Sequence, residues 1–401
     1  GPAEAEARQG LALAREAGDR AGEAGCLHTL GAVAYHRGEF ARCATCCRDA
    51  LALRRALGDR RGEAAAMQAL GSVMPEIGEA DRARETKRAA LELYREIGDR
   101  RGEGTALGSL GDSLMRAHRI EEALECYEQA VAAAVELGDV PGEAAALLSR
   151  GRAYGVVARI EDSKRSFRRA LDLFRELGDP SGEAEVLDEM GSAIAAFGER
   201  DEALSCLTSA RESAQRTARP VLLVRVLRHL ANVQHEGGSR EIAWRLYEEA
   251  LDGADRRGRS ETLADMGNAA LREGDFDRAT KLLQEGLGEG AEQGRSLVSL
   301  CRLARAHKAA GRVREAEACA LRAEQRVRGE EGVSPHHGPE IYYSLGTVFE
   351  REERGRRYLR TANELLRTRT RSIRSIVHRQ HYLTVTRPNR EILEEVRRLP
   401  V

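Results

Sequence analysis

Three cysteines are the residues whose type and spacing come closest to a metal site. Cys43, Cys46 and Cys47 form a CxxCC string. A structural zinc site usually needs a second pair of ligands at a suitable distance, and the sequence contains no second CxxC. Cys43 and Cys47 also fall on the small and large positions of a repeating packing pattern, where a thiol acts as a small apolar side chain. We therefore interpret the string as core packing.

Two histidine pairs offer weaker support for metal binding. They are His378 with His381, three residues apart, and the adjacent His336 and His337. The first pair could share one face of a helix, but no carboxylate partner stands out for it. The second pair lies in a segment with the composition of a loop. We predict no metal site.

Motifs for phosphate binding, acyl transfer and metalloprotease chemistry are missing from the sequence. There is no GxxxxGK[ST] loop, no GxSxG elbow and no HExxH. Every glycine-rich string is explained by an internal repeat. We therefore predict a protein that is not an enzyme and that uses no cofactor.

An arginine-rich segment near the C-terminus is a candidate for binding an anionic partner. Residues 354–379 hold nine arginines and one acidic residue. The candidate residues for an anionic patch are Arg367, Arg369, Arg371 and Arg374. One interpretation is a nucleic-acid surface. The other, which we favour, is a solvated last helix or one paired with acidic residues, because the segment lacks the interleaved aromatics typical of single-strand binding.

Composition and charge exclude several classes of partner. The 401 residues carry 64 Lys and Arg against 65 Asp and Glu, a net charge of −1, which suggests neither nucleic acid nor a membrane. No stretch approaches the about 18 apolar residues of a membrane span. Eight cysteines, mostly within apolar helical patterns, favour a reducing cytoplasm. Only four of the basic residues are lysines, which indicates GC-rich codons and a bacterial source.

The elements that position these residues are set by a six-residue phrase with a 40-residue period. Its copies lie at residues 18–23, 58–63, 98–103, 138–143 and 178–183. A strict period of this size marks a solenoid of stacked units. Each unit is predicted to hold two helices, A and B. Gly98 is expected to end helix B at positive φ, and Asp99 to cap the next helix A.

Small and large residues alternate between the two predicted helices. Glycines recur on helix A at positions 31, 71, 111, 151 and 191, and alanines recur on helix B. Larger residues stand beside the alanines at Tyr127, Phe167, Leu207 and Tyr247. This pattern predicts close approach of the paired helices, with large side chains filling the space beside small ones.

The same positions carry a resemblance to a known repeat. Met190-Gly191, Gly198, Ala203, Leu207 and Ala210 follow the spacing of the tetratricopeptide repeat, as do Leu230-Ala231, Gly238, Ala243, Tyr247 and Ala250. The unit is similar to the subclass of about 40 residues in kinesin light chain and LGN-type scaffolds and in bacterial multidomain signalling regulators. The resemblance implies an all-α fold, a right-handed superhelical solenoid of about eight to nine helix-turn-helix repeats.

The repeat also predicts how the chain is divided. We expect an expression scar at 1–2, helix B of a truncated repeat at 3–20, and the repeat array at 21–325. A loop is predicted at 326–340, a degenerate last repeat at 339–375 and a C-terminal capping segment at 376–401. The start in mid-repeat predicts further domains upstream, and an uncapped apolar end makes self-association conceivable.

The resemblance places helix A on the concave face of the solenoid. The residues then predicted to line a partner-binding groove are Arg116, Arg152, Arg225, Arg228, Asn232, His235, Asn268, Arg272, Arg305 and Lys308. Asn232 and Asn268 match the asparagine that holds a peptide backbone in the resembling scaffolds, although plain solvation of these residues remains the alternative. Glu185, Asp188, Glu236 and Glu261 oppose the arginines, so the predicted groove is mixed in charge.

Three functions are compatible with this pattern. The first is a scaffold that binds a protein or peptide, with an acidic segment favoured, in the groove. The second is the sensor or regulatory arm of a larger bacterial signalling protein, and it overlaps with the first. The third is binding of nucleic acid or another anionic partner through the arginine-rich helix. We favour protein interaction in a regulatory setting.

Overall fold

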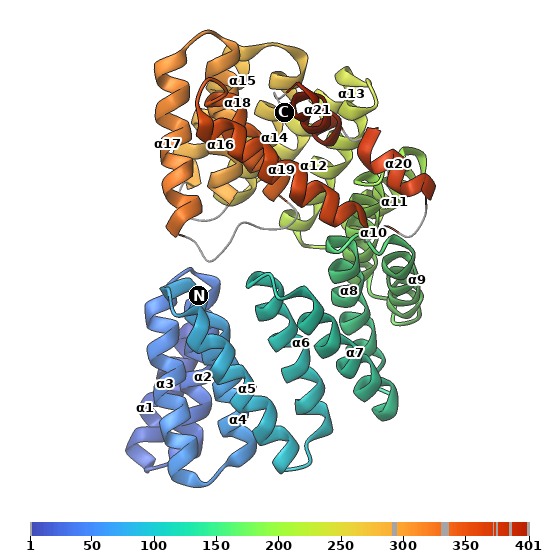
Figure 1. Cartoon of the computed structure of the whole chain (residues 1–401). Helices are drawn as coiled ribbons and strands as arrows, with labels where there is room; N and C mark the ends of the chain where they lie inside the picture. Colours follow the sequence, from blue (N-terminus) through green and yellow to red (C-terminus); the bar gives the residue numbers. More distant parts are fainter. Residues whose placement is uncertain are drawn as a thin grey trace. The chain divides into compact units, whose positions relative to one another are not determined.

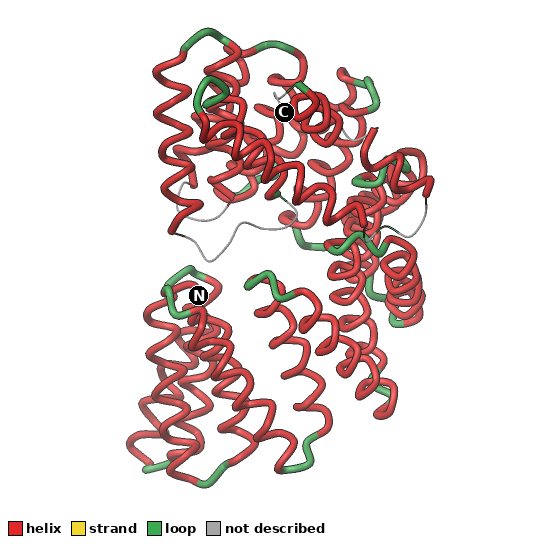
Figure 2. The backbone as a smooth tube through the Cα atoms, viewed as in Figure 1, coloured by secondary structure: helices red, strands yellow, loops and turns green. Residues whose placement is uncertain are grey.

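The structure is a computed structural model that describes residues 2–290, 295–329, 337–371, 373, 376–384 and 387–398. Its described residues contain helices and no strand (Figure 2), which confirms the predicted all-α class. The chain divides into two compact units, Gly1–Arg150 (unit 1) and Gly151–Val401 (unit 2). Figure 1 draws unit 1 in blue to teal and unit 2 in green to red.

Unit 1 is built from helices that pair in chain order. They are α1 (Pro2–Ala17), α2 (Arg20–His36), α3 (Phe40–Leu57), α4 (Arg60–Val73), the short 3-10 helix η1 (Met74–Ile77), α5 (Ala80–Glu96), α6 (Arg100–Arg116) and α7 (Ile120–Leu137). Helix α8 (Val140–Val156) contains the boundary between the units. From α1 to α7, each helix packs against the next along the chain.

Unit 2 continues the pairing. Its helices are α9 (Ile160–Glu176), α10 (Pro180–Ala195), α11 (Arg200–Gln215), α12 (Pro220–Glu236), α13 (Arg240–Asp252), α14 (Arg256–Glu273), α15 (Phe276–Gly290), α16 (Arg295–Ala309), α17 (Val313–Gly329), α18 (Gly338–Val348), α19 (Glu353–Arg371), α20 (Ile376–Thr384) and α21 (Arg387–Arg397). The described residues thus form nine successive helix pairs, from α2/α3 to α18/α19, as the sequence predicts.

The repeated phrase forms the joint between one pair and the next. Gly98 has φ of 69°, a conformation that glycine adopts without steric cost. Asp99 follows as the cap of α6, and its carboxylate accepts a hydrogen bond of 2.9 Å from the backbone N–H of Gly102. Such a cap stabilises a helix by about 1 kcal/mol. The predicted stop and cap are confirmed.

The predicted match of small and large residues is also confirmed. A Cβ added to Gly111 would lie 2.6 Å from the ring of Tyr127, and one added to Gly151 would lie 2.6 Å from Phe167. Both rings are buried. Lys87 takes the same position against Gly71, so one repeat places a lysine where its neighbours carry an apolar side chain.

Two local features depart from a regular pair of helices. Pro75 would remove a hydrogen bond from a helix interior, and α4 ends at Val73, before this proline, with η1 following it. The loop predicted at 326–340 is too long, because α17 continues to Gly329 and α18 begins at Gly338. Its central part, 330–336, lies outside the described residues, and so does His336.

The C-terminal helices turn back along unit 2. The rings of Tyr382 on α20 and Phe197, just after α10, lie 5.5 Å apart. His378 contacts Glu199 through Nε2 at 2.8 Å. Helix α19 therefore leads from α18 to α20, which lies beside α10 and α11, and α21 then packs on α18 and α19 (Figure 1). Among the described helices, none is long and apolar enough to cross a membrane.

Candidate partner-binding face

The first helices of successive pairs in unit 2 form a row. They are α10, α12, α14, α16 and α18, and each contacts the next. We call this set the first-helix row. It carries every residue predicted for the groove except Arg116, which lies on α6, and Arg152, which lies on α8.

Asp188 is the most buried charged residue of the row. It is fully buried, and its carboxylate contacts Arg225 Nε and His229 Nδ1, both at 2.7 Å. Burial alone would raise the pKa of Asp188, but the charges of His229 and Arg225 outweigh it and hold the pKa below its usual value. Burial likewise opposes the charged form of His229, yet Asp188 raises the pKa of the imidazole overall. Arg225 is thus occupied within the chain.

Ser192, His229 and Asp188 bring together the residue types of a hydrolase triad. Their geometry differs from a triad in one decisive respect. Ser192 Oγ lies 3.0 Å from His229 Nδ1, the same nitrogen that contacts Asp188. A proton relay needs the serine and the carboxylate on opposite nitrogens of the ring, so this cluster links α10 to α12 and lacks the relay geometry.

Arg228 forms the next link of the row, from α12 to α14. Its side chain is buried and pairs with Glu261 and with Asp265, the latter at 2.9 Å. Burial would raise the pKa of Asp265, but Arg228 and Arg302 hold it below its usual range. Sequence reasoning placed Arg228 on the groove surface, whereas the structure makes it a buried structural cation.

Two further predicted residues of α12 have partners within the repeat. Tyr247 donates a hydrogen bond of 2.6 Å to the side-chain oxygen of Asn232. His235 is buried, and its Nε2 lies 2.9 Å from Glu273, which also accepts a hydrogen bond from Trp244. These contacts tie the first helix of a pair to the second helix and to the next pair.

Of the remaining predicted cations, two form ion pairs with nearby carboxylates and two are exposed on the surface. Arg272 pairs with Glu236 at 2.6 Å, and Lys308 pairs with Glu350 at 2.7 Å. Arg116 and Arg152 are exposed. Arg116 makes a long contact of 3.5 Å with the hydroxyl of Ser113. The predicted mixture of charges on this face is therefore present, mostly as ion pairs between neighbouring helices.

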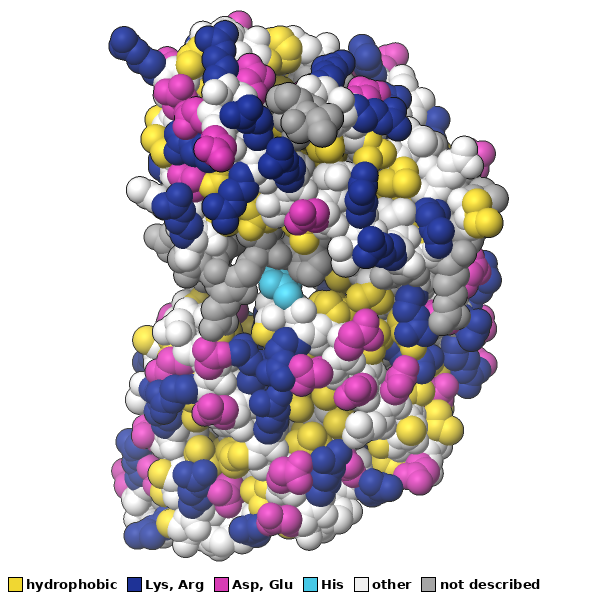
Figure 3. All heavy atoms as spheres, viewed as in Figure 1, with side chains coloured by type: hydrophobic (Ala, Val, Ile, Leu, Met, Phe, Trp, Pro, Cys, Tyr) yellow, Lys and Arg dark blue, Asp and Glu magenta, His cyan; other side chains and the backbone are white. Residues whose placement is uncertain are grey.

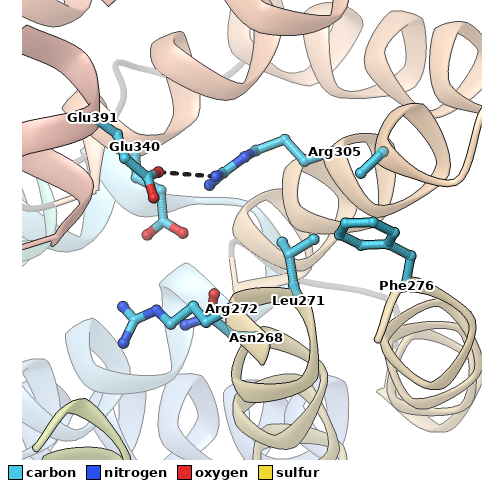
Figure 4. A pocket seen from close by; sticks show the side chains of 8 residues that line it. Asn268, Leu271, Arg272, Phe276, Arg305, Glu340 and Glu391 are labelled. Carbon is cyan, nitrogen blue, oxygen red and sulfur yellow. Dashed lines mark hydrogen bonds and ion pairs between the residues drawn. The ribbon is translucent and has the colours of Figure 1, made fainter. Parts of the chain in front are cut away.

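A pocket opens in the row between α14, α16 and α18, beside α21. Its volume is about 150 Å³. The residues that line it are Asn268, Leu271, Arg272, Phe276, Arg305, Ala309, Glu340 and Glu391 (Figure 4). The structure thus brings together three of the predicted groove residues: Asn268, Arg272 and Arg305.

The polar groups of this pocket are not equivalent. Glu340 is held by Arg302 through two bonds of 2.7 and 3.1 Å, and despite burial this lowers the pKa of Glu340 to about 2. Arg305 contacts Glu391 of α21 at 3.1 Å and stacks over the ring of Tyr343. Asn268 is half-buried and makes no side-chain hydrogen bond to any described residue.

The arginine-rich patch does not form as the sequence predicts. Arg367 and Arg371 are exposed on α19, but Arg369 is buried and its guanidinium lies 5.4 Å from the ring centre of Tyr382. Arg374 lies outside the described residues. The helical period turns alternate arginines to opposite faces. Basic and acidic side chains are interspersed across the face that Figure 3 shows.

Several carboxylates of this face escaped sequence reasoning. They are Asp265, Glu273, Glu340 and Glu391, which contact Arg228, His235, Arg302 and Arg305. A signal was present for the first three, because each pair spans 37 or 38 residues, slightly less than one repeat. No such signal existed for Glu391, which lies 86 residues from Arg305.

Comparison with known proteins agrees with this architecture. Residues 23–96 and 102–176 match the family model described as tetratricopeptide repeat. No curated protein matches the sequence. The fold defines a helical repeat protein with the architecture of a tetratricopeptide repeat array, and residues 23–96 and 102–176 carry the match to that family. This fold supports a role as a protein-interaction scaffold.

Solved structures share the fold at low sequence identity. A Rap protein complexed with Competence and Sporulation Factor has a TM-score of 0.54 and 14% identity, covering 94% of this chain and 99% of its own. The quorum sensor NprR from B. thuringiensis, in its apo form, has a TM-score of 0.50 and 15% identity, with coverage of 80% and 98%. A tetratricopeptide repeat protein from Parabacteroides merdae gives 0.50 and 15%, with coverage of 70% and 97%.

Proposed function

We propose that unit 2 binds an acidic segment of a partner protein along the first-helix row. The observation that carries this proposal is the pocket of about 150 Å³, where Asn268 has no hydrogen-bond partner among the described side chains and Arg305 and Arg272 lie beside it. An asparagine amide can donate to a carbonyl and accept from an amide, which suits a peptide backbone. The two guanidinium groups suit a carboxylate.

The apolar part of the pocket adds to the same proposal. Leu271, Phe276 and Ala309 line it next to the polar groups. Ligand sites typically combine an apolar lining with a few polar groups that fix orientation. A partner segment with an acidic side chain next to an apolar one could contact both the arginines and the apolar residues of this lining.

We further propose that the chain is the sensor or regulatory region of a larger bacterial signalling protein, located in the cytoplasm, where adjacent domains are partners as well. The Rap protein was solved with Competence and Sporulation Factor, and NprR is a quorum sensor. Their shared fold is in keeping with a sensing role. We also propose that the array associates with a second copy of itself.

The experiment that tests the proposal compares partner capture by the native chain and by two variants. The first variant combines Asn268→Ala with Arg305→Gln, and the matched control is Arg257→Ala, an exposed arginine of α14. Capture of the same protein by the native chain and the control, with loss in the double variant, would support the proposal. Equal capture by all three would contradict it.

Nucleic-acid binding through α19 is not supported in the same way. The burial of Arg369 removes the centre of the predicted patch. If the captured species were nucleic acid, its affinity would fall steeply with salt and depend on Arg367 and Arg371. That result would replace the proposed function.

A further inference from the structure

The pocket of unit 2 already holds a carboxylate from the chain itself. Glu391 of α21 lies 3.1 Å from Arg305 and lines the pocket beside Asn268 and Arg272 (Figure 4). Arg305 and Glu391 are both partly exposed, at 21% and 23% of their side chains. The pair is therefore reachable from solvent, and another carboxylate could exchange with Glu391.

We propose, resting on the proposed function, that α21 is an internal competitor of the partner. Glu391 occupies the position beside Arg305 that an acidic side chain of the partner takes when it binds. The partner must displace α21 from the pocket, so binding and release of the C-terminal helix are coupled. The partner chemistry is that of the side chain it replaces: a glutamate or aspartate of an acidic peptide.

The way α21 is held is consistent with displacement. It is a helix of 11 residues, shorter than the about 12–15 residues at which an isolated helix becomes even marginally stable in water. Its helical state therefore depends on docking. Asn389 is buried and donates to the backbone oxygen of Tyr382, and Ile392 is buried. Helix α21 also packs on α18, α19 and α20, and Glu391 is its ion-paired link to Arg305 of α16.

The other end of the segment is anchored independently. On α20, Tyr382 packs on Phe197 and His378 contacts Glu199, both near the start of the row. This anchor keeps α21 close to the pocket after release. A tethered competitor of this kind acts at an effective concentration in the millimolar range. The apparent affinity for a free peptide is then the affinity of the open pocket multiplied by the fraction of chains in which the pocket is open.

The other carboxylate of the pocket does not qualify as the competitor. Glu340 is engaged by Arg302 in a two-bond pair, in which the two side chains are only 15% and 14% exposed. Its removal would leave Arg302 without its partner in the interior. Glu391 is different, since a single bond of 3.1 Å links it to Arg305 and their side chains are 23% and 21% exposed.

The test uses the full chain and a fluorescein-labelled hexaglutamate peptide, with anisotropy as the readout of binding. Glu391→Gln keeps the shape of the side chain and removes its charge. The matched control is Glu394→Gln on the same helix, where the carboxylate is 52% exposed and pairs only distantly with Arg390. We expect Glu391→Gln to bind about tenfold more tightly than the native chain, and Glu394→Gln to bind as the native chain does.

A second measurement follows α21 directly by hydrogen exchange of its backbone amides. We expect addition of hexaglutamate to the native chain to speed exchange in 387–397 and to leave α19 unchanged. We also expect Glu391→Gln to speed it without peptide. Peptide binding that is equally tight in the native chain and Glu391→Gln, or that leaves the exchange of α21 unchanged, would overturn the competitor while the proposed function stands.

A third variant separates failure of the inference from failure of the proposed function. Arg305→Gln should abolish hexaglutamate binding in both the native and the Glu391→Gln backgrounds. If hexaglutamate binds none of the chains, or binds Arg305→Gln as well as the native chain, the acidic-partner site itself fails, and the competitor fails with it. A neutral hexaserine peptide serves as the control for the charge of the ligand.

Discussion

Lys87 donates a hydrogen bond of 2.8 Å to the hydroxyl of Ser113, and both side chains are buried. A second bond, of 3.1 Å, runs from the same ammonium to the backbone oxygen of Ser109. The stem of Lys87 packs against Gly71, as the ring of Tyr127 packs against Gly111 in the next repeat. Lys87 thus places a charged ammonium group in the interior of unit 1, at a position where the next repeat has the ring of Tyr127.

The first prediction is that this charge costs stability. Burial lowers the pKa of Lys87 to about 8, below its value in the unfolded chain, so folding is disfavoured while the amine is protonated. Stability should therefore rise between about pH 8 and pH 10.5. Lys87→Met should increase the free energy of unfolding at pH 7 by about 1–3 kcal/mol and remove that rise.

Urea denaturation at pH 7 and pH 10 measures both effects, with the exposed Lys281→Met as control. The chain has only four lysines, so labelled lysine side chains also give few enough NMR signals to follow the titration of Lys87 itself. A loss of stability in Lys87→Met would instead mean that the bonds to Ser113 and Ser109 outweigh the cost of the buried charge.

The second prediction concerns Arg228. Arg228→Ala should lower the free energy of unfolding by about 3–5 kcal/mol, because it leaves Glu261 and Asp265 without their buried partner. Arg257→Ala should change it by less than about 1 kcal/mol, since that exposed arginine only flanks Glu261. Thermal denaturation of the two variants decides the matter, and similar melting temperatures would refute the structural role of Arg228.

The third prediction is an acid transition in unit 2. Arg302 holds the pKa of Glu340 at about 2, below the ordinary value of 4.5. The stabilisation is therefore complete above about pH 4.5 and is lost as the pH falls towards 2. It amounts to roughly 3 kcal/mol at neutral pH.

Glu340→Gln provides the check on this transition. The variant should be less stable than the native chain at pH 6, and the difference should shrink as the pH falls towards 2, where the carboxyl of Glu340 becomes protonated. Chemical denaturation at several pH values measures this. The exposed Glu241→Gln is the control, and a difference that stayed constant across the range would contradict the assignment to Glu340.

The fourth prediction compares two glycines of α6. Gly111→Ala should destabilise the chain by about 1–3 kcal/mol, because its Cβ would lie 2.6 Å from the ring of Tyr127. Gly108→Ala should be neutral or stabilising by up to about 1 kcal/mol, since nothing lies within 4 Å of its Cβ. The two melting temperatures should therefore move in opposite directions, and a shared shift would argue against the close approach of α6 and α7.

Much of the fold could be predicted because the same residue types recur at the same positions of each repeat. Gly98 and Asp99 mark the joint between helices, and Gly111 with Tyr127 marks the contact between them. These are short-range relationships, within one repeat or across one turn. The loop predicted at 326–340 was too long because Gly329 and Gly338 are of a type common in loops, whereas the structure includes them in helices.

The candidate site was only partly predictable. The helical spacing put Arg228, Asn268 and Arg305 on the first helices of their pairs, but it could not say which of them stay available. That depends on whether a carboxylate of the next helix lies within reach. Arg228 is buried between two such carboxylates, while Asn268 lines an open pocket.

By itself, the sequence determined the helical repeat, its joints and its resemblance to the tetratricopeptide repeat, because those depend on residues close together in the chain. Only the tertiary structure decided which charges are neutralised and that Glu391 meets Arg305 across 86 residues. The physical reason is that side-chain pairing depends on distance in space and on access of water. Both are set by how the helices stack and by where the C-terminal helices turn back.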